Sequence, residues 1–126
     1  MTLSQAISRA DALCPNQYTN DQKTAWISSL DGTIFEEIIK THEGHDEDTF
    51  DGYTYDASTA ATVELLVPFP YDDIYIFWLI SQYYLNNAEM ENYNSEITLY
   101  NTAYADYADY YNRHNMPKQK ATFFKT

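Results

Sequence analysis

A tyrosine-rich pattern near the end of the chain is the feature that most limits what it can fold into. Seven residues there recur at alternating spacings of three and four, and most are tyrosines: Met90, Tyr93, Ile97, Tyr100, Tyr104, Tyr107 and Tyr111. Such spacing places all of them on one stripe of a single α-helix. A helix of about 22 residues is roughly 33 Å long. The pattern therefore predicts one long helix that ends near Arg113–Asn115.

Tyrosine in place of leucine leaves two interpretations of this stripe open. A tyrosine ring buries apolar surface while its hydroxyl can meet water or a polar group, so the stripe suits both a core and a wet interface. Most of it is expected to pack against the protein's own helices. The residues considered for contact with a partner along its edge are Tyr100, Tyr104, Tyr107 and Tyr111.

Length and composition predict one modest domain that does not enter a membrane. The chain has 126 residues, which suffices for a single core, and it has no apolar run of 18 or more residues. The interrupted pattern of its first residues, with Asp11, does not resemble a secretory signal. A lone cysteine, Cys14, cannot form an internal disulfide and fits a reducing compartment, where it is expected to act as a small apolar residue. We therefore expect synthesis in the cytoplasm.

Charge is distributed very unevenly. The formal net charge is −12, and no lysine or arginine occurs between Lys40 and Arg113. The carboxylates in that interval are Glu43, Asp46, Glu47, Asp48, Asp51, Asp56, Glu64, Asp72, Asp73, Glu89, Glu91, Glu96, Asp106 and Asp109. Such a surface repels nucleic-acid phosphates, which argues against sequence-specific DNA or RNA binding. It remains compatible with DNA mimicry, with a channel through which DNA slides, or with solubility alone.

Two helices are expected in the first third of the chain. The first covers about 3–13 and ends before Pro15, because the residue before a proline is disfavoured in the helical region. Thr19 and Gln22 have the spacing of a capping box, which opens a second helix over about 20–42. Its apolar pattern continues through Gly32, at a cost of about 1 kcal/mol relative to alanine. Gly44 is expected to follow its end.

The middle of the chain predicts a long loop and then a buried helix. Residues 43–62 are polar and acidic, so we expect a functional or mobile loop, with a short hairpin near Asp51–Gly52. An extended segment over 63–67 leads to a Pro-Phe-Pro corner. The next helix, from Tyr71 or Asp72 to about Leu85, is apolar on nearly all sides and so central. Asn87 is expected to cap the tyrosine-striped helix.

These elements predict an all-α fold, a small bundle of about four helices. The helical domain is expected over 1–116, followed by an extended basic and aromatic tail over 117–126. Phe123 and Phe124 in that tail are candidates for docking, because free tails rarely expose adjacent phenylalanines. The residues considered for an acidic channel or docking loop are Glu43, Asp46, Glu47, Asp48 and Asp51.

Little in the sequence points to catalysis or to a cofactor. The segment from His42 to Asp48 combines histidines and carboxylates, the residue types that bind zinc, but its spacing matches no strong motif and a solvated acidic loop is the simpler interpretation. Asp46, Asp48 and Asp51 do not follow the EF-hand pattern. Three glycines cannot build a phosphate-binding loop, and no nucleophile motif is present. We therefore expect neither an enzyme nor a resident metal or cofactor.

Residues 68–117 resemble a group of small proteins of tailed bacteriophages and prophages of Gram-positive bacteria. That group shares a Pro-x-Pro-Tyr-Asp corner, then a helix with repeated asparagine–tyrosine motifs. The matching residues here are Pro68, Pro70, Tyr71, Asp72, Glu89, Tyr93, Asn94, Tyr100, Asn101, Tyr104, Tyr107, Tyr111, Asn112, Arg113, Met116 and Pro117. Asn115 departs from the histidine that the group often has there. With the earlier segment LDGTIFEEIIKTHEG, the resemblance covers about three quarters of the chain.

This resemblance implies a head–tail connector, an adaptor that adds a ring beneath the portal. It implies a helical bundle that assembles as a 12-subunit ring in the neck of the virion, between the portal protein and the next neck or tail-completion protein. The genome would pass through it without sequence-specific binding, and no enzymatic activity is implied. The alternative suggested by charge is an acidic DNA mimic that inhibits a host nuclease or DNA-binding protein.

Overall fold

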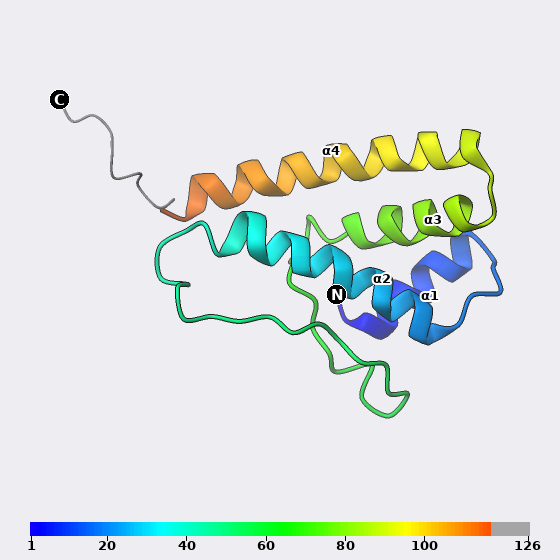
Figure 1. Ribbon diagram of the computed structural model, residues 1–126, viewed down its shortest axis with the longest axis horizontal. Helices are drawn as coiled ribbons and strands as arrows, with labels where there is room; N and C mark the ends of the chain where they lie inside the picture. The colour runs from blue at the N-terminus through cyan, green and yellow to red at the C-terminus, as the bar shows by residue number, and fades with distance from the viewer. Residues whose placement is uncertain (117–126) are drawn as a thin grey trace.

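A computed structural model describes residues 1–116 as a bundle of four α-helices (Figure 1). The helices are α1 (Leu3–Leu13), α2 (Asn20–Ile34), α3 (Ile74–Asn86) and α4 (Met90–His114), and a π-helical segment η1 (Phe35–Ile39) directly continues α2. No strand forms within these residues; one isolated bridge joins Thr2 and Glu64. The expected all-α fold with a long C-terminal helix is therefore confirmed.

The first two helices begin as their sequences predict. The Thr2 hydroxyl accepts a hydrogen bond from the Gln5 N–H, and the Gln5 side chain accepts one from the Thr2 N–H. Thr19 and Gln22 form the same reciprocal pair at the start of α2. Each box satisfies two N–H groups that a helix start otherwise leaves without partners.

The second helix passes through Gly32 without interruption but ends in a wider turn. From Phe35 to Ile39 the helix is π-helical, and the Lys40 N–H donates to the Phe35 carbonyl over 2.8 Å. The regular α-helix thus ends at Ile34, and the whole helical segment ends at Ile39, three residues before the predicted end. Gly32 lies within the regular α-helix, and the departure from α-helical geometry begins three residues later, at Phe35.

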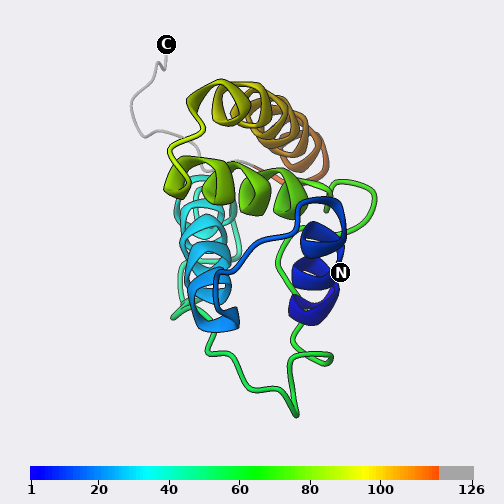
Figure 2. The same ribbon diagram turned by 90° about the vertical axis from the view of Figure 1, so that its right-hand side faces the viewer.

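Helix α3 is the central element of the bundle, as its apolar composition predicts. Figure 2 shows α3 between α4 on one side and α1 and α2 on the other. The side chains of Ile74, Tyr75, Leu79 and Tyr83 are fully buried. At the contact with α2, the Trp78 Nε1–H donates to the Trp26 carbonyl over 2.8 Å, and the Trp78 ring lies 4.8 Å from that of Tyr100 in α4.

Two predicted boundaries around α3 and α4 were wrong. The helix begins at Ile74, because the residues after the Pro-Phe-Pro corner form turns in which the Tyr71 N–H donates to the Pro68 carbonyl over 2.9 Å. Asn87 does not cap α4, whose N-cap residue is Glu89. The Asn87 side chain instead accepts a hydrogen bond from Tyr18 at 2.5 Å and donates one to Glu89 at 3.0 Å.

The segment between η1 and α3 runs along the side of the bundle away from α4 (Figure 1). The expected hairpin at Asp51–Gly52 was wrong, since no strand pair forms there. The extended segment over 63–67 is present and lies beside the start of α1, where the Leu3 N–H donates to the Val63 carbonyl over 2.8 Å. Within residues 1–116, no helix has the length and apolarity that crossing a membrane would require.

Candidate interaction surface

The C-terminal part of the tyrosine stripe, from Tyr100 onward, packs against the protein's own helices, whereas Met90 at its start is exposed. Tyr107 is only 2% exposed, and Tyr100, Tyr104 and Tyr111 are partly buried against the same core. Burial raises the pKa of Tyr100 to about 12, with a contribution from the nearby Glu37 carboxylate. The Tyr100 hydroxyl therefore stays protonated near neutral pH.

Tyr110 lies beside the stripe and was not part of the pattern identified in the sequence. The Tyr110 ring lies 4.7 Å from that of Tyr71, just after the proline corner, and Tyr71 also approaches Tyr107 at 6.0 Å. Tyr110 is three residues from Tyr107, so the two share one side of the helix. This spacing was the signal that could have identified it.

A buried carboxylate fastens the long loop to the bundle, and sequence reasoning missed it. Asp31 is fully buried and accepts hydrogen bonds from the hydroxyls of Tyr53 (2.5 Å) and Tyr75 (2.6 Å) and from the Leu66 N–H (3.1 Å). Burial raises the pKa of Asp31, although all three hydrogen bonds act in the opposite direction. Tyr75 in turn accepts a hydrogen bond from the Val67 N–H at 2.8 Å.

The loop is also held to α2 one turn earlier. The Ser28 hydroxyl donates to the Tyr53 carbonyl at 3.3 Å and accepts from the Tyr53 N–H at 2.8 Å. Gly52 has a φ of +89°, and a Cβ there would lie 3.5 Å from the Ser28 side chain. These contacts replace the strand pairing that a hairpin would have supplied.

The histidine and acid segment at 42–48 is divided between core and surface. His42 is buried, with Nδ1 lying 2.5 Å from the Ile38 carbonyl and Nε2 lying 2.8 Å from Oδ1 of Asn112 in α4. His45 donates to Asp48 at 2.7 Å. Within residues 1–116, no group of three or more histidine, cysteine or acidic side chains is arranged to hold a metal ion. The His42 contacts instead fix the loop to the end of α4.

The predicted acidic residues lie on the surface. Glu43, Asp46, Glu47, Asp48 and Asp51 are all exposed. The two nearest cations in the first helices are engaged elsewhere, because Arg9 pairs with Asp73 at 3.2 Å and Lys23 with Asp11 at 2.8 Å. In the described part of the chain, no lysine or arginine forms an ion pair with Glu43, Glu47 or Asp51.

One end of the molecule brings this acidic loop to the end of α4. The Glu43 N–H donates to the Met116 carbonyl at 2.9 Å, and the Tyr111 hydroxyl lies 3.3 Å from His45 Nε2. We call this region, residues 42–48 with 111–116, the acidic end. The other predicted docking residues, Phe123 and Phe124, lie outside the described residues.

The outward side of α4 carries short side chains. Its exposed residues include Asn94, Ser95, Thr98, Asn101, Thr102, Ala105, Asp106 and Asp109. The hydroxyls of Ser95, Thr98 and Thr102 donate to carbonyls of their own helix at 3.3, 2.9 and 3.2 Å. Because these donors already have partners, another helix could cover this side without leaving them unsatisfied. We call it the outer face of α4.

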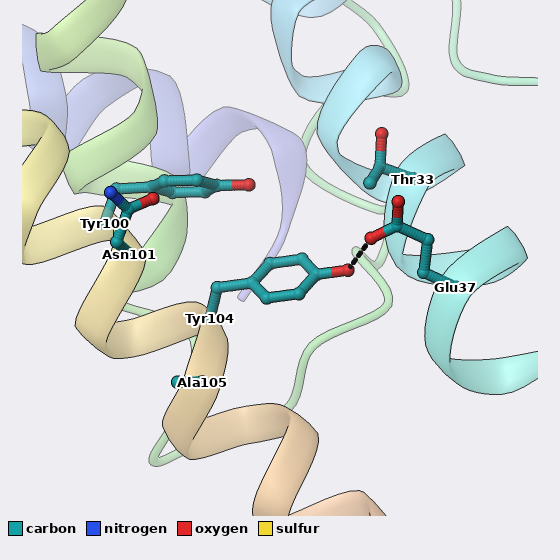
Figure 3. A pocket seen from close by; sticks show the side chains of 6 residues that line it. All are labelled: Thr33, Glu37, Tyr100, Asn101, Tyr104 and Ala105. Carbon is teal, nitrogen blue, oxygen red and sulfur yellow. Dashed lines mark hydrogen bonds between the residues drawn. The ribbon is translucent and has the colours of Figure 1, made fainter.

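A shallow groove lies between α2–η1 and the middle of α4 (Figure 3). Its hollow has a volume of about 260 Å³ and is lined by Thr33, Glu37, Tyr100, Asn101, Tyr104 and Ala105. Tyr104 points across the groove and donates to Glu37 at 2.6 Å. Burial and this hydrogen bond raise the pKa of the Tyr104 hydroxyl.

The described residues thus form an exposed acidic end, an outer face of α4 and a shallow groove. Comparison with protein-family models, with curated proteins and with solved structures finds no match for this chain. The connector function implied by the sequence resemblance therefore stays a prediction, and the acidic end and the outer face of α4 are the surfaces on which it can be examined.

Proposed function

We propose that this chain is a virion structural protein, a head–tail connector that forms a ring beneath the portal of a tailed bacteriophage. The observation that carries the proposal is the exposed acidic surface of a helical bundle. Glu43, Glu47 and Asp51 are exposed, and no ion pair joins them to a lysine or arginine within residues 1–116. A channel wall of this charge repels DNA phosphates and allows the genome to pass without sticking.

The outer face of α4 is the inter-subunit contact in this proposal. The tyrosine stripe, which the sequence had offered for that role, is occupied largely by the subunit's own core. Thr98 and Thr102 have short side chains whose hydroxyls already donate within α4, so they allow a neighbouring helix to approach closely. If this face meets a different face of the next subunit, the contact can close into a ring, and the sequence resemblance implies 12 subunits.

The remaining partners follow from the same resemblance. The acidic end and residues 117–126 would contact the portal protein on one side and the next neck or tail-completion protein on the other. The subunit would be made in the host cytoplasm and end in the virion neck. Deleting residues 117–126 should leave a folded monomer that no longer joins portal-containing particles; normal incorporation would contradict this role for the tail.

The decisive experiment is the composition of purified phage particles from a host strain that carries the gene. Mass spectrometry should find the protein at a copy number close to that of the portal protein, and immunogold labelling should place it at the neck. Its absence from virions, together with salt-sensitive copurification with a host nuclease or DNA-binding protein, would instead support the acidic DNA mimic.

A pair of variants tests the ring contact. Thr102→Arg places a long charged side chain on the outer face of α4, so particle incorporation should fall at least tenfold while the monomer stays folded. Ser29→Arg makes the same change at an exposed position of α2 and should be incorporated normally. Equal incorporation of both variants would show that the outer face of α4 is not the contact.

A further inference from the structure

The groove between α2–η1 and α4 has a size and shape that suit one side chain. Its hollow of about 260 Å³ is smaller than the roughly 300–1,000 Å³ of most small-molecule sites. The rings of Tyr100 and Tyr104 and the methyl group of Ala105 supply apolar lining, and Asn101 and Thr33 stand at its rim (Figure 3). An aromatic ring inserted from outside would cover this lining.

One wall of the groove is acidic. Glu37 lines the groove, and its Oε1 accepts the Tyr104 hydroxyl at 2.6 Å. Glu36 is its exposed neighbour in η1 and lies outside the lining. No ion pair engages either carboxylate within residues 1–116. The chemistry that complements the groove is therefore a peptide that combines an aromatic side chain with lysines.

The last ten residues of this chain have that composition. The segment 117–126 reads PKQKATFFKT, with Lys118 and Lys120 before Phe123–Phe124 and Lys125 after them. Such a segment brings positive charge to the acidic wall and an aromatic ring to the hollow.

The departure point of the segment is close enough for it to reach the groove. Met116 is fixed beside the end of η1, because its carbonyl accepts the Glu43 N–H at 2.9 Å. Tyr104 lies twelve residues back along α4, which is about 18 Å at 1.5 Å per residue. Seven extended residues from 117 to 123 span up to about 24 Å.

We propose that residues 117–126 bind in the groove of their own subunit, with a phenylalanine ring from Phe123–Phe124 in the hollow and lysines beside Glu36 and Glu37. The segment thereby covers the exposed edges of Tyr100 and Tyr104. This arrangement is that of the isolated subunit and does not depend on a role in virions; contact of residues 117–126 with a portal or neck protein would replace it.

Amide NMR spectra of the full chain test the proposal. Replacing both Phe123 and Phe124 by serine should shift the backbone amide signals of the groove residues Thr33, Glu37, Asn101 and Ala105. The control Gln119→Ala changes the same segment without touching its aromatic or charged groups, and it should leave those signals in place. Unchanged groove signals in the double-serine variant would refute the proposal.

A second pair of variants tests the groove by filling it with a bulky side chain in one variant and leaving it open in the other. Ala105→Trp should displace the segment and narrow the amide signals of residues 117–126, whereas Ala25→Trp, at an exposed position of α2, should not. Circular dichroism establishes that both variants retain their helices. If the groove signals of the wild-type chain move with protein concentration, the segment binds a second copy, which overturns the intramolecular arrangement. The phage-particle experiment is separate, so failure here would leave the connector proposal standing.

Discussion

Replacing Tyr75 by phenylalanine should be one of the most damaging single-atom deletions in this protein. The Tyr75 hydroxyl donates to Asp31 at 2.6 Å and accepts the Val67 N–H at 2.8 Å, and the side chain is fully buried. Without the hydroxyl, Asp31 loses one of three donors and the Val67 N–H loses its acceptor. Water has no access to replace either one.

The size of the loss follows from these two contacts. A hydrogen bond to a charged group contributes about 1.5–3 kcal/mol, and a buried N–H left without a partner costs about 1–3 kcal/mol. The free energy of unfolding should therefore fall by about 3–5 kcal/mol in Tyr75→Phe. Tyr53→Phe removes only one bond to Asp31, from a half-buried ring, so its loss should be about 1–2 kcal/mol.

Urea denaturation followed by far-UV circular dichroism measures both variants. With a slope of about 1–3 kcal/mol per molar urea, the Tyr75→Phe midpoint should fall by about 2 M, and the Tyr53→Phe midpoint by less than half as much. Equal losses in the two variants would refute the assigned role of the Val67 N–H.

The pH dependence supplies a second test of the same site. The folded-state pKa of Asp31 is raised above 3.8 because the side chain is buried, so its ionisation opposes folding. The linked stability is complete below 3.8 and is lost as the pH rises through the folded-state pKa. Tyr75→Phe removes a bond that lowers this pKa, so its deficit relative to wild type should grow as the pH rises from 3.8 through the folded-state pKa of Asp31. A deficit that shrinks over that range would contradict the argument.

Three further outcomes are expected. Burial opposes the ionisation of Asp11, but hydrogen bonds from Lys23, Asn16 and Tyr83 lower its pKa overall. Wild type should therefore be more stable than Asp11→Asn by about 1–2 kcal/mol in urea denaturation. This advantage should be complete above pH 3.8 and disappear as the pH falls through the folded-state pKa of Asp11. Tyr107→Ala should cost about 3–5 kcal/mol, because it empties a buried aromatic site; a cost below 1 kcal/mol in the same assay would contradict its place in the core. Chelation with EDTA should leave the melting temperature unchanged, since the residues around His42 and His45 bind each other and α4; a drop of several degrees would reveal a metal site.

The helices of this protein could be predicted because their determinants are local. The capping pairs Thr2–Gln5 and Thr19–Gln22 mark two starts within a few residues of sequence. The tyrosine spacing similarly locates α4, because a period of 3.6 residues is visible without knowledge of any neighbour.

The contacts that fasten the loop could not be predicted, because their partners are far apart in sequence. Asp31 accepts hydrogen bonds from Tyr53, Leu66 and Tyr75, and its local sequence beside Gly32 gives no sign of these partners. His42 had the residue type of a metal ligand, but burial against Asn112, seventy residues away, determines its role. The same limit applies to the candidate interface. The sequence spacing identified a stripe on α4, and only the packing showed that this stripe faces the core and that the opposite side faces outward.

The pairing of Trp78 with Trp26 has a practical consequence for spectroscopy. These are the only two tryptophans in the chain, and both lie where α2 meets α3, with Trp78 also against Tyr100 of α4 and Trp26 near Tyr83. Tryptophan fluorescence therefore reports on the junction of α2, α3 and α4 and is insensitive to the segment between η1 and α3. An unfolding step that alters the tyrosine signal before the tryptophan signal would identify release of that segment as a separate event.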